Sequence, residues 1–362
     1  MRAICEREGS VVSAKPTLHD VADAAGVSIK TVSNVINDRP KVGPATRERV
    51  KRIIEELGYR PNLSARGLRS GRTGVIGLVV PTLRERYFSE LANDIIRAAA
   101  VRGLRVMVEQ TGGSRDEEIA ALSGGTLRFI DGLLFSPAAL GQADADLLRT
   151  EEPLVLLGER IFGGPTDHVT MHNISSARAA VEHLLARGRT RIALIGAGSG
   201  PDDEASSASL RERGYLQALR AAGIPEDPAL IVRGDAWRRA TGVDATQRLR
   251  DAGTAFDAVF ALNDTMALGA LRALSEEGLR VPEDVMLVGF DNIDDSRFSL
   301  PSLTSVDPGR REIAERAVDM LIERIDEKGE PRPARTVKAD FRLVYRETTG
   351  FRNDDWKTDT DI

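Results

Sequence analysis

The sequence predicts an all-α head followed by a larger α/β body with parallel sheets, and three observations lead to this fold class. At 362 residues the chain is longer than one ordinary domain. Apolar residues recur at helical spacing up to about residue 60, and from Thr73 onward short apolar strands alternate with helical patterns. Residues 1–73 hold 14 Lys or Arg and 8 Asp or Glu, a net charge of +6, whereas the whole chain carries −5. This basic head on an acidic body indicates that the head contacts a polyanion, although a solvated charged surface explains the charge alone equally well.

The N-terminal segment and the cysteine content indicate where the protein resides. Residues 1–15 carry charges of both signs and no apolar core, which predicts a disordered leader and not a signal peptide. Cys5 is the only cysteine, so no internal disulfide or Cys-rich zinc site is expected, as is typical of a reducing cytoplasm. The four histidines show no metal-ligand spacing, and no apolar run is long enough to cross a bilayer. We therefore expect a cytoplasmic protein without a metal, a cofactor or a membrane partner.

The head, residues 16–61, has the pattern of three short helices. A capping-box-like start at Thr17 opens the first helix, and Gly26 ends it with a sharp turn. Ser28 is the expected N-cap of the second helix, and Pro44 opens the third in the first turn, where proline is tolerated. Two helices joined by a tight glycine turn, with a third to complete the core, predict a helix-turn-helix unit.

In that geometry the second helix enters the major groove of DNA and its N-terminal residues meet the base edges. Lys30 suits guanine, Asn34 suits adenine, and Ile29 can contact a thymine methyl group. Thr17, at the start of the head, is a further DNA-binding candidate. Short hydroxyl side chains that can reach phosphates without holding the helix away from the groove lie at Ser28, Thr31 and Ser33. Each of these residues alone is ordinary solvated surface, whereas the ordered set predicts a DNA-reading helix.

The span from Thr17 to Ser70 resembles the DNA-binding head of the lactose repressor/galactose repressor (LacI/GalR) family. The pattern T-L-x-D-V-A-x-x-A-G-V-S-x-x-T-V-S-x-V-I-N is present without a gap, and "RERVKRIIEELGYRPN" follows it. In the family, the two residues after the Ser that starts the recognition helix, and one near its end, select the operator. The resemblance therefore implies that Ile29, Lys30 and Asn34 do so here.

The segment 62–73 is predicted to be a hinge helix or linker. Asn62 can cap a helix that is too short to be stable alone, so we expect it to order only on DNA. The family resemblance implies that Leu68 wedges into the minor groove with Ala65 beside it, while Arg66 meets phosphates. A plain flexible linker is the alternative that composition alone favours.

The body, residues 74–347, contains two series of strand–helix units. The first holds "GVIGLVVP", "RVMVEQ", "DGLLFSP" and "PLVLLGE", and the second, from about Ser175, holds "RIALIGAG", "FDAVFALND" and "DVMLVGFDN". Continuous apolar strands alternating with helices predict parallel sheets covered on both faces, and two series predict two lobes with a cleft between them. Ligands bind such sheets beyond the carboxyl ends of the strands.

This body resembles the effector core of the same family, which is also the fold of periplasmic sugar-binding proteins. The resemblance implies three crossovers between lobes, expected near Asn173, Thr304 and Ala334. Lobe 1 is then about 74–173 and 304–334, and lobe 2 about 174–303 and 335–347. Residues 348–362 form a polar tail without leucine heptads, which favours a dimer over a tetramer.

Candidate effector-binding residues lie at strand ends or on the loops that follow. The family resemblance points to Arg211 and Trp237, and strand ends point to Asn263 and Asp291. An Arg, an Asn and an Asp beside an indole suit a sugar or another polyhydroxylated ligand. Asn263 and Asp291 have turn capping as the alternative, and Trp237 has ordinary packing. First-lobe candidates are Pro81, Tyr87, Phe88, Gln110 and Ser136.

Together these features predict a transcriptional repressor that binds a near-palindromic operator as a homodimer under the control of a small-molecule effector, a sugar or sugar derivative. Two rivals use the same two lobes: a solute-binding protein and a sugar-metabolising enzyme fused to a DNA-binding head. The basic head argues against the first, and no carboxylate or Ser/His spacing typical of a catalytic site supports the second. We therefore expect no enzymatic activity.

Overall fold

The structure is a computed structural model that describes residues 16–351, apart from 37–38, 60–71, 199–204, 235 and 331. The chain divides into two compact units, Met1–Thr73 and Gly74–Ile362. The expected leader, most of the hinge and the tail beyond residue 351 lie outside the described residues. The hinge candidates Asn62, Ala65, Arg66 and Leu68 lie outside them too.

The head consists of helices α1 (Leu18–Ala25), α2 (Ile29–Ile36) and α3 (Pro44–Glu56). The Thr17–Asp20 capping box is present: the Thr17 backbone N–H donates to the Asp20 carboxylate at 2.7 Å, and the Asp20 N–H donates to the Thr17 hydroxyl at 3.4 Å. Gly26 then ends α1 with a left-handed φ of 61°, a conformation that favours glycine. The start and the sharp turn therefore follow directly from local sequence.

A small apolar core holds these helices together. Val21 from α1, Val32 from α2 and Val50 from α3 are fully buried in it. Ala22 and Ala25 also face this core, whereas Ala24 is exposed.

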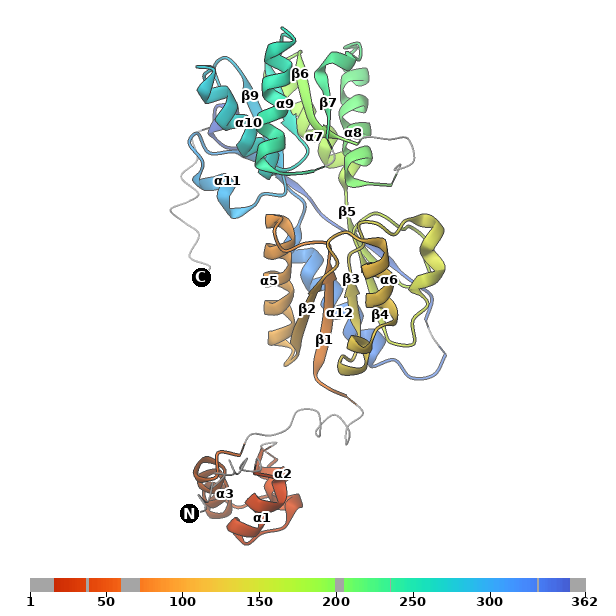
Figure 1. Cartoon of the computed structure of the whole chain (residues 1–362), viewed down its shortest axis with the longest axis vertical. Coiled ribbons are helices and arrows are strands. Elements are labelled where there is room, and N and C mark those ends of the chain that lie inside the picture. Colours follow the sequence, from red (N-terminus) through yellow and green to blue (C-terminus); the bar gives the residue numbers. More distant parts are fainter. Residues whose placement is uncertain are drawn as a thin grey trace, which may run out of the picture. The chain divides into compact units, whose positions relative to one another are not determined.

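Lobe 1 of the body is a six-stranded parallel sheet in the order β11-β5-β4-β3-β1-β2 (Figure 1). Helices α5 (Arg86–Val101) and α12 (Arg310–Ile325) pack against each other on one face, and α6 (Arg115–Ser123) belongs to the core on the other. The strands are β1 (Val75–Val80), β2 (Arg105–Gln110), β3 (Leu133–Phe135), β4 (Leu154–Leu157), β5 (Asp167–Met171) and β11 (Thr336–Ala339). Two 3-10 turns lie between α6 and β4, namely η1 (Gly125–Phe129) and η2 (Gln142–Leu148). A third, η3 (Pro228–Leu230), belongs to lobe 2.

Lobe 2 is a second six-stranded sheet in the order β12-β10-β9-β8-β6-β7. All its pairings are parallel except that of β12 with β10, which is antiparallel and departs from the expected all-parallel sheet. Helices α7 and α8 pack against each other, as do α9 and α10. The strands are β6 (Ile192–Ala197), β7 (Ile231–Arg233), β8 (Ala258–Ala261), β9 (Met286–Phe290), β10 (Thr304–Asp307) and β12 (Arg342–Val344). The helices are α7 (Asn173–Ala186), α8 (Ser207–Ala221), α9 (Arg239–Asp251), α10 (Asp264–Glu276) and α11 (Asp294–Phe298), with η4 (Glu347–Thr349) after β12.

Three chain segments connect the lobes, and two of them differ from the sequence-based placement. The first follows β5 at Asn173, as expected. The second falls between β10 and α12 rather than near Thr304, because β10 pairs with β9 in lobe 2. The third falls between β11 and β12 rather than near Ala334, because β11 pairs with β5 in lobe 1.

Buried polar contacts explain why β10 stays in lobe 2. The Thr304 and Ser305 side chains are fully buried, and Ser305 donates to the Asp264 carboxylate of α10 at 2.6 Å. The Thr304 N–H donates to the Thr348 hydroxyl at 2.8 Å. These partners are distant in the sequence, so apolar periodicity alone does not reveal them.

None of the helices in the part of the chain that the structure describes combines the length and the apolar character needed to span a bilayer.

Candidate functional site

The DNA-reading candidates lie on α2 and at its start. Lys30 is exposed, while Ser33 and Asn34 are partly exposed. The Ser28 hydroxyl accepts a hydrogen bond from the Thr31 N–H at 3.1 Å and lies 2.9 Å from the Thr31 hydroxyl. Ser28 is therefore the N-cap of α2, and both hydroxyls stay near the positively polarised helix terminus, where a phosphate is favoured.

Two other head candidates have structural contacts of their own. Ile29 is partly buried and packs against the head core, so only part of its side chain remains for a base contact. The Thr17 hydroxyl donates to the Asp20 carboxylate at 2.7 Å. Hydrogen bonds from Thr17 lower the pKa of Asp20, so the cap is ionised at neutral pH and favours the helix N-terminus.

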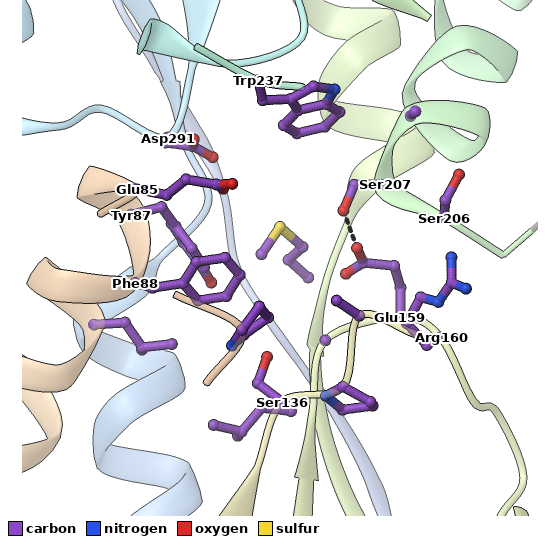
Figure 2. A pocket seen from close by; sticks show the side chains of 18 of the residues that line it. Glu85, Tyr87, Phe88, Ser136, Glu159, Arg160, Ser206, Ser207, Trp237 and Asp291 are labelled. Atoms are coloured by element: carbon purple, nitrogen blue, oxygen red, sulfur yellow. Dashed lines mark hydrogen bonds between the residues drawn. The ribbon is translucent and has the colours of Figure 1, made fainter. Parts of the chain in front are cut away.

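A cavity of about 510 Å³ lies between the two lobes of the body, at the carboxyl ends of their parallel strands. Its size falls within the range of about 300–1,000 Å³ that small-molecule sites occupy. Side chains converge on it from both sides, with Tyr87, Phe88 and Ser136 from lobe 1 opposite Trp237 and Asp291 from lobe 2 (Figure 2). Seven effector candidates line it: Pro81, Tyr87, Phe88, Ser136, Arg211, Trp237 and Asp291.

Arg211 of α8 is the central cation of this cavity. It is 3% exposed, and its Nη1 lies 3.7 Å from an Asp291 carboxylate oxygen. Its Nε donates to the Asn173 side-chain oxygen at 2.8 Å, and its Nη1 also donates to the Leu262 carbonyl. Burial lowers the pKa of Arg211 and raises that of Asp291 well above its usual value, and each charge partly offsets the shift of the other.

Asp291 follows β9 in an unusual backbone conformation. Its φ is 106°, a region that non-glycine residues rarely adopt and that costs about 1–3 kcal/mol. The backbone is fixed there because the Asp291 N–H donates to the Val306 carbonyl at 2.8 Å. No hydrogen bond to its carboxylate oxygens is formed within the described ranges, so this carboxylate lines the cavity with acceptor capacity in reserve.

Aromatic rings supply the apolar part of the wall. The Arg211 guanidinium carbon lies 3.5 Å from the ring centroid of Phe290 and 5.3 Å from that of Trp237. Tyr87 and Phe88 make an edge-to-face pair with centroids 5.3 Å apart. Burial, with the Asp291 charge, raises the pKa of Tyr87, so its hydroxyl keeps its proton. The cavity thus offers an indole face, a neutral phenol and a buried ion pair.

Two effector candidates do not line the cavity. Asn263 caps α10, with its side-chain oxygen accepting from the Met266 N–H at 2.8 Å, and its amide donates to the Trp237 carbonyl at 3.4 Å. The Gln110 side chain accepts from the Leu83 N–H at 3.2 Å on the exposed end of β2. Both side chains therefore hold loops beside the cavity. In the structure Asn263 has the capping role that was the alternative to effector binding.

Two residues that were not predicted from the sequence join the lobes across the cavity. Glu159, two residues after the end of β4, accepts a hydrogen bond from the Ser207 hydroxyl at the start of α8 (Figure 2). Glu159 is also the last residue of the strand segment "PLVLLGE", so the strand-end rule that selected Asp291 applies to it as well. Ser207 follows no apolar strand, so the strand-end rule does not select it; it is the first residue of α8.

A third missed residue, Glu85, stands before α5 on the lobe 1 side. Burial raises the pKa of its carboxyl, and the charge of Arg238 in lobe 2 opposes that rise. Beside the cavity, Arg86 pairs with Asp295 at 3.3 Å, and Glu90 accepts from the Asp294 N–H at 3.0 Å. Lobe-to-lobe contacts therefore come from α5 as well as from Glu159.

Comparisons with known proteins agree with both parts of the chain. Residues 17–62 match the model of "Bacterial regulatory proteins, lacI family", and residues 181–349 match that of "Periplasmic binding protein-like domain". The first match contains the helix-turn-helix unit, and the second contains the lobe 2 side of the cavity.

Solved structures extend the similarity over almost the whole chain. A LacI-family transcriptional regulator from Sanguibacter keddieii DSM 10542 is 49% identical, with a TM-score of 0.71, over 77% of this chain and 100% of its own. The transcriptional regulator CelR in complex with cellobiose is 34% identical, with a TM-score of 0.66, over 92% and 99%. The Lac repressor dimer bound to operator and the anti-inducer ONPF is 30% identical, with a TM-score of 0.77, over 93% and 99%. The chain belongs to the lacI family of bacterial regulatory proteins, and it is a DNA-binding transcriptional regulator and not an enzyme.

Proposed function

We propose that the protein is a cytoplasmic repressor that binds a near-palindromic operator as a homodimer and changes its operator affinity when a sugar or sugar derivative binds between its lobes. This proposal rests on one observation: the same chain contains an exposed recognition helix and a two-lobed body. The cavity of that body, about 510 Å³, presents a buried Arg–Asp pair beside an indole ring.

On the DNA side, Lys30 and Asn34 are the proposed base-reading residues, and Ile29 is a minor contributor because it is partly buried. Ser28 and Thr31 at the start of α2, Ser33 within α2 and Thr17 at the start of α1 are proposed to contact phosphates. The hinge residues Asn62, Ala65, Arg66 and Leu68 retain the roles that the family resemblance implies, with Leu68 as the minor-groove wedge.

On the effector side, the arrangement suits a neutral polyhydroxylated ligand. The Asp291 carboxylate accepts hydrogen bonds from ligand hydroxyls, Arg211 donates to ring or hydroxyl oxygens, and Trp237 covers an apolar sugar face. The related CelR was solved with cellobiose, which makes this disaccharide a suitable first ligand. The effector shifts operator affinity by as much as it discriminates between two arrangements of the lobes.

An anisotropy titration on the promoter fragment beside the gene tests DNA recognition. We expect affinity to fall steeply with salt, since Lys and Arg displace counterions from phosphates. Lys30→Ala is expected to cost about 1–3 kcal/mol on the operator and to relax preference at one or two base pairs. Lys51→Ala, an exposed change on α3, is the matched control, with a smaller loss that is uniform across sequences. Equal losses for both variants on operator and random DNA would contradict base reading by Lys30.

The proposed dimer surface lies on the side of the body where Arg86 of α5 pairs with Asp295 of α11. Val101 at the end of α5 is 86% exposed and Leu300 after α11 is 91% exposed, and Ile96 and Phe298 nearby in the sequence are exposed too. We infer that association of two copies buries these side chains, since homodimer interfaces are more apolar than the rest of the surface.

We expect Val101→Glu to convert dimers to monomers, because a buried unpaired carboxylate opposes association. Operator affinity falls in parallel, since one head reads a half-site only. Analytical ultracentrifugation measures the change, with Leu147→Glu, an exposed apolar position on η2, as the control that stays dimeric. A Val101→Glu protein that sediments as the wild type would exclude this surface.

A further inference from the structure

The loop that follows β3 forms part of the lobe 1 wall of the cavity. Ser136, Pro137 and Ala138 line the cavity directly. The carbonyl of Leu140, further along the loop, accepts from the Arg160 Nε at 3.3 Å. Arg160 also lines the cavity, next to Glu159, which contacts Ser207 of lobe 2. The backbone course of residues 136–140 therefore sets the position of several wall groups at once.

A single buried carboxylate holds this loop from behind. Glu118 of α6 is fully buried, and its two oxygens accept from three consecutive backbone amides. The distances are 2.7 Å from Ala138, 3.0 and 3.2 Å from Ala139, and 2.8 Å from Leu140. Consecutive amides that converge on one anion form a compact nest, and hydrogen bonds to a charged acceptor are the stronger kind.

No ion pair to Glu118 forms among the residues that the structure describes, so the loop amides are its main compensation. A buried carboxylate without compensation is strongly disfavoured, and the loop amides would lose their acceptors if it were absent. The carboxylate and the loop conformation therefore depend on each other. The carboxylate fixes the loop, and through the loop it fixes the cavity wall.

We propose that Glu118 is a positioning residue of the effector site, which binds no effector itself but holds Ser136–Ala138 in the geometry that the effector contacts. The proposal rests on the function proposed above for the cavity. It assigns a role in effector binding to a residue of α6 that lies behind the cavity wall and is absent from the lining.

The conservative change Glu118→Gln distinguishes this role from plain core packing. Glutamine has nearly the same volume, so it leaves no cavity, but its NH₂ group is a donor where one carboxylate oxygen accepted. That group faces backbone amides, which are also donors, so the nest cannot close. Glu117→Gln, an exposed change of the same charge on the same helix, is the matched control. Leu122→Ala on α6 is the stability control, since it removes core packing but no acceptor.

Two measurements on the full-length protein test the proposal. Hydrogen exchange followed by mass spectrometry reports the amides of Ala138–Leu140, and calorimetric titration with cellobiose reports ligand affinity. In Glu118→Gln we expect these amides to exchange about ten- to hundredfold faster, and cellobiose to bind about tenfold or more weakly. Glu117→Gln behaves as the wild type, and Leu122→Ala lowers Tm without selective change in this loop.

A double-mutant cycle with Ser136→Ala adds a readout that a merely structural role does not move. If Glu118 acts through the wall, the two losses of cellobiose affinity overlap and the double variant loses less than their combined effect. The proposal is overturned if the amides of Ala138–Leu140 exchange at the wild-type rate in Glu118→Gln. It is also overturned if Glu118→Gln and Leu122→Ala have the same Tm and Glu118→Gln loses no more cellobiose affinity than Leu122→Ala. A wild-type protein that does not bind cellobiose contradicts the ligand choice made above, and the exchange result then decides the role of Glu118.

Discussion

Arg211→Ala is expected to abolish the response of the protein to its effector while leaving operator binding in the absence of effector intact. The guanidinium is almost fully buried and lies among Asp291, Asn173 and the Leu262 carbonyl. Truncating one member of a buried, hydrogen-bonded charge pair costs about 2–5 kcal/mol, or roughly 30- to 4,000-fold in effector affinity. The loss arises from the missing donors and from the Asp291 carboxylate, which is left buried without its cation.

The change also alters how Asp291 titrates. Burial already raises the pKa of Asp291, and the Arg211 charge is the largest opposing influence. Without Arg211 the pKa of Asp291 rises further, so the carboxyl favours its protonated form and becomes a weaker acceptor for effector hydroxyls. As pH decreases, effector affinity in the variant is therefore expected to begin falling at a higher pH than in the wild type, because Asp291 becomes protonated earlier.

Calorimetric titration with the effector and anisotropy on operator DNA, with and without effector, measure both parts of this expectation. Arg213→Ala is the matched control, because Arg213 is exposed on the same helix and does not line the cavity. If Arg211→Ala binds the effector with wild-type affinity and its operator affinity still changes when the effector is added, Arg211 is not an effector-binding residue.

Asp264→Ala is expected to lower the free energy of unfolding of the body by about 3–5 kcal/mol. The carboxylate is fully buried at the start of α10 and accepts from the Ser305 hydroxyl at 2.6 Å, the Ser296 hydroxyl at 2.7 Å and the Ile293 N–H at 2.9 Å. Alanine leaves these three donors buried without an acceptor. Because Ile293 lies two residues after Asp291, the loss also loosens the turn that presents Asp291 to the cavity. Urea unfolding with cellobiose titration in parallel detects both effects.

The pH dependence of the Asp264 effect has a defined sign. Burial raises the pKa of Asp264 to about 6, above the value of 3.8 that it has when solvated. The folded state then holds this proton more tightly than the unfolded state, so stability is present in full below about pH 4 and is lost as pH rises through about 6. A shift of this size corresponds to about 3 kcal/mol between pH 4 and pH 7.

Asp264→Asn serves as the control for that dependence, since it retains one acceptor oxygen and does not titrate. The difference in unfolding free energy between wild type and Asp264→Asn is expected to change in favour of the variant as pH rises from 4 to 7. A constant difference over this range would show that the Asp264 carboxyl does not change its protonation on folding. An Asp264→Ala protein of wild-type stability would contradict the role of its three hydrogen bonds.

Local sequence determined the head and most of the body. Three features of the head depend only on residues close to them in the sequence: the Thr17 capping box, the Gly26 turn and the Pro44 helix start. They can therefore be predicted without knowledge of the tertiary structure. The body strands are continuous apolar segments between helical patterns, which is typical of parallel sheets covered on both faces. Because ligand sites of such sheets lie at the carboxyl ends of strands, the positions of Ser136 and Asp291 in the cavity wall follow from the same reasoning.

Family resemblance added Arg211 and Trp237, whose positions within a helix and a loop carry no strand-end pattern. The structure lines the cavity with both of them. It also separates Asn263 from the lining, because a side chain at a strand end can equally cap the helix that follows, and the local sequence is the same in both cases.

The tertiary structure alone decided which distant segments meet. The positions of the lobe crossovers depend on the pairing of β10 with β9 and of β11 with β5. Hydrophobic periodicity does not show which strands pair. The Glu159–Ser207 contact joins two lobes, and the Glu118 nest joins a helix to a loop some twenty residues later. Periodicity records which face of an element is buried, whereas the identity of the partner on that face is set by long-range packing and hydrogen bonding, which no short stretch of sequence contains.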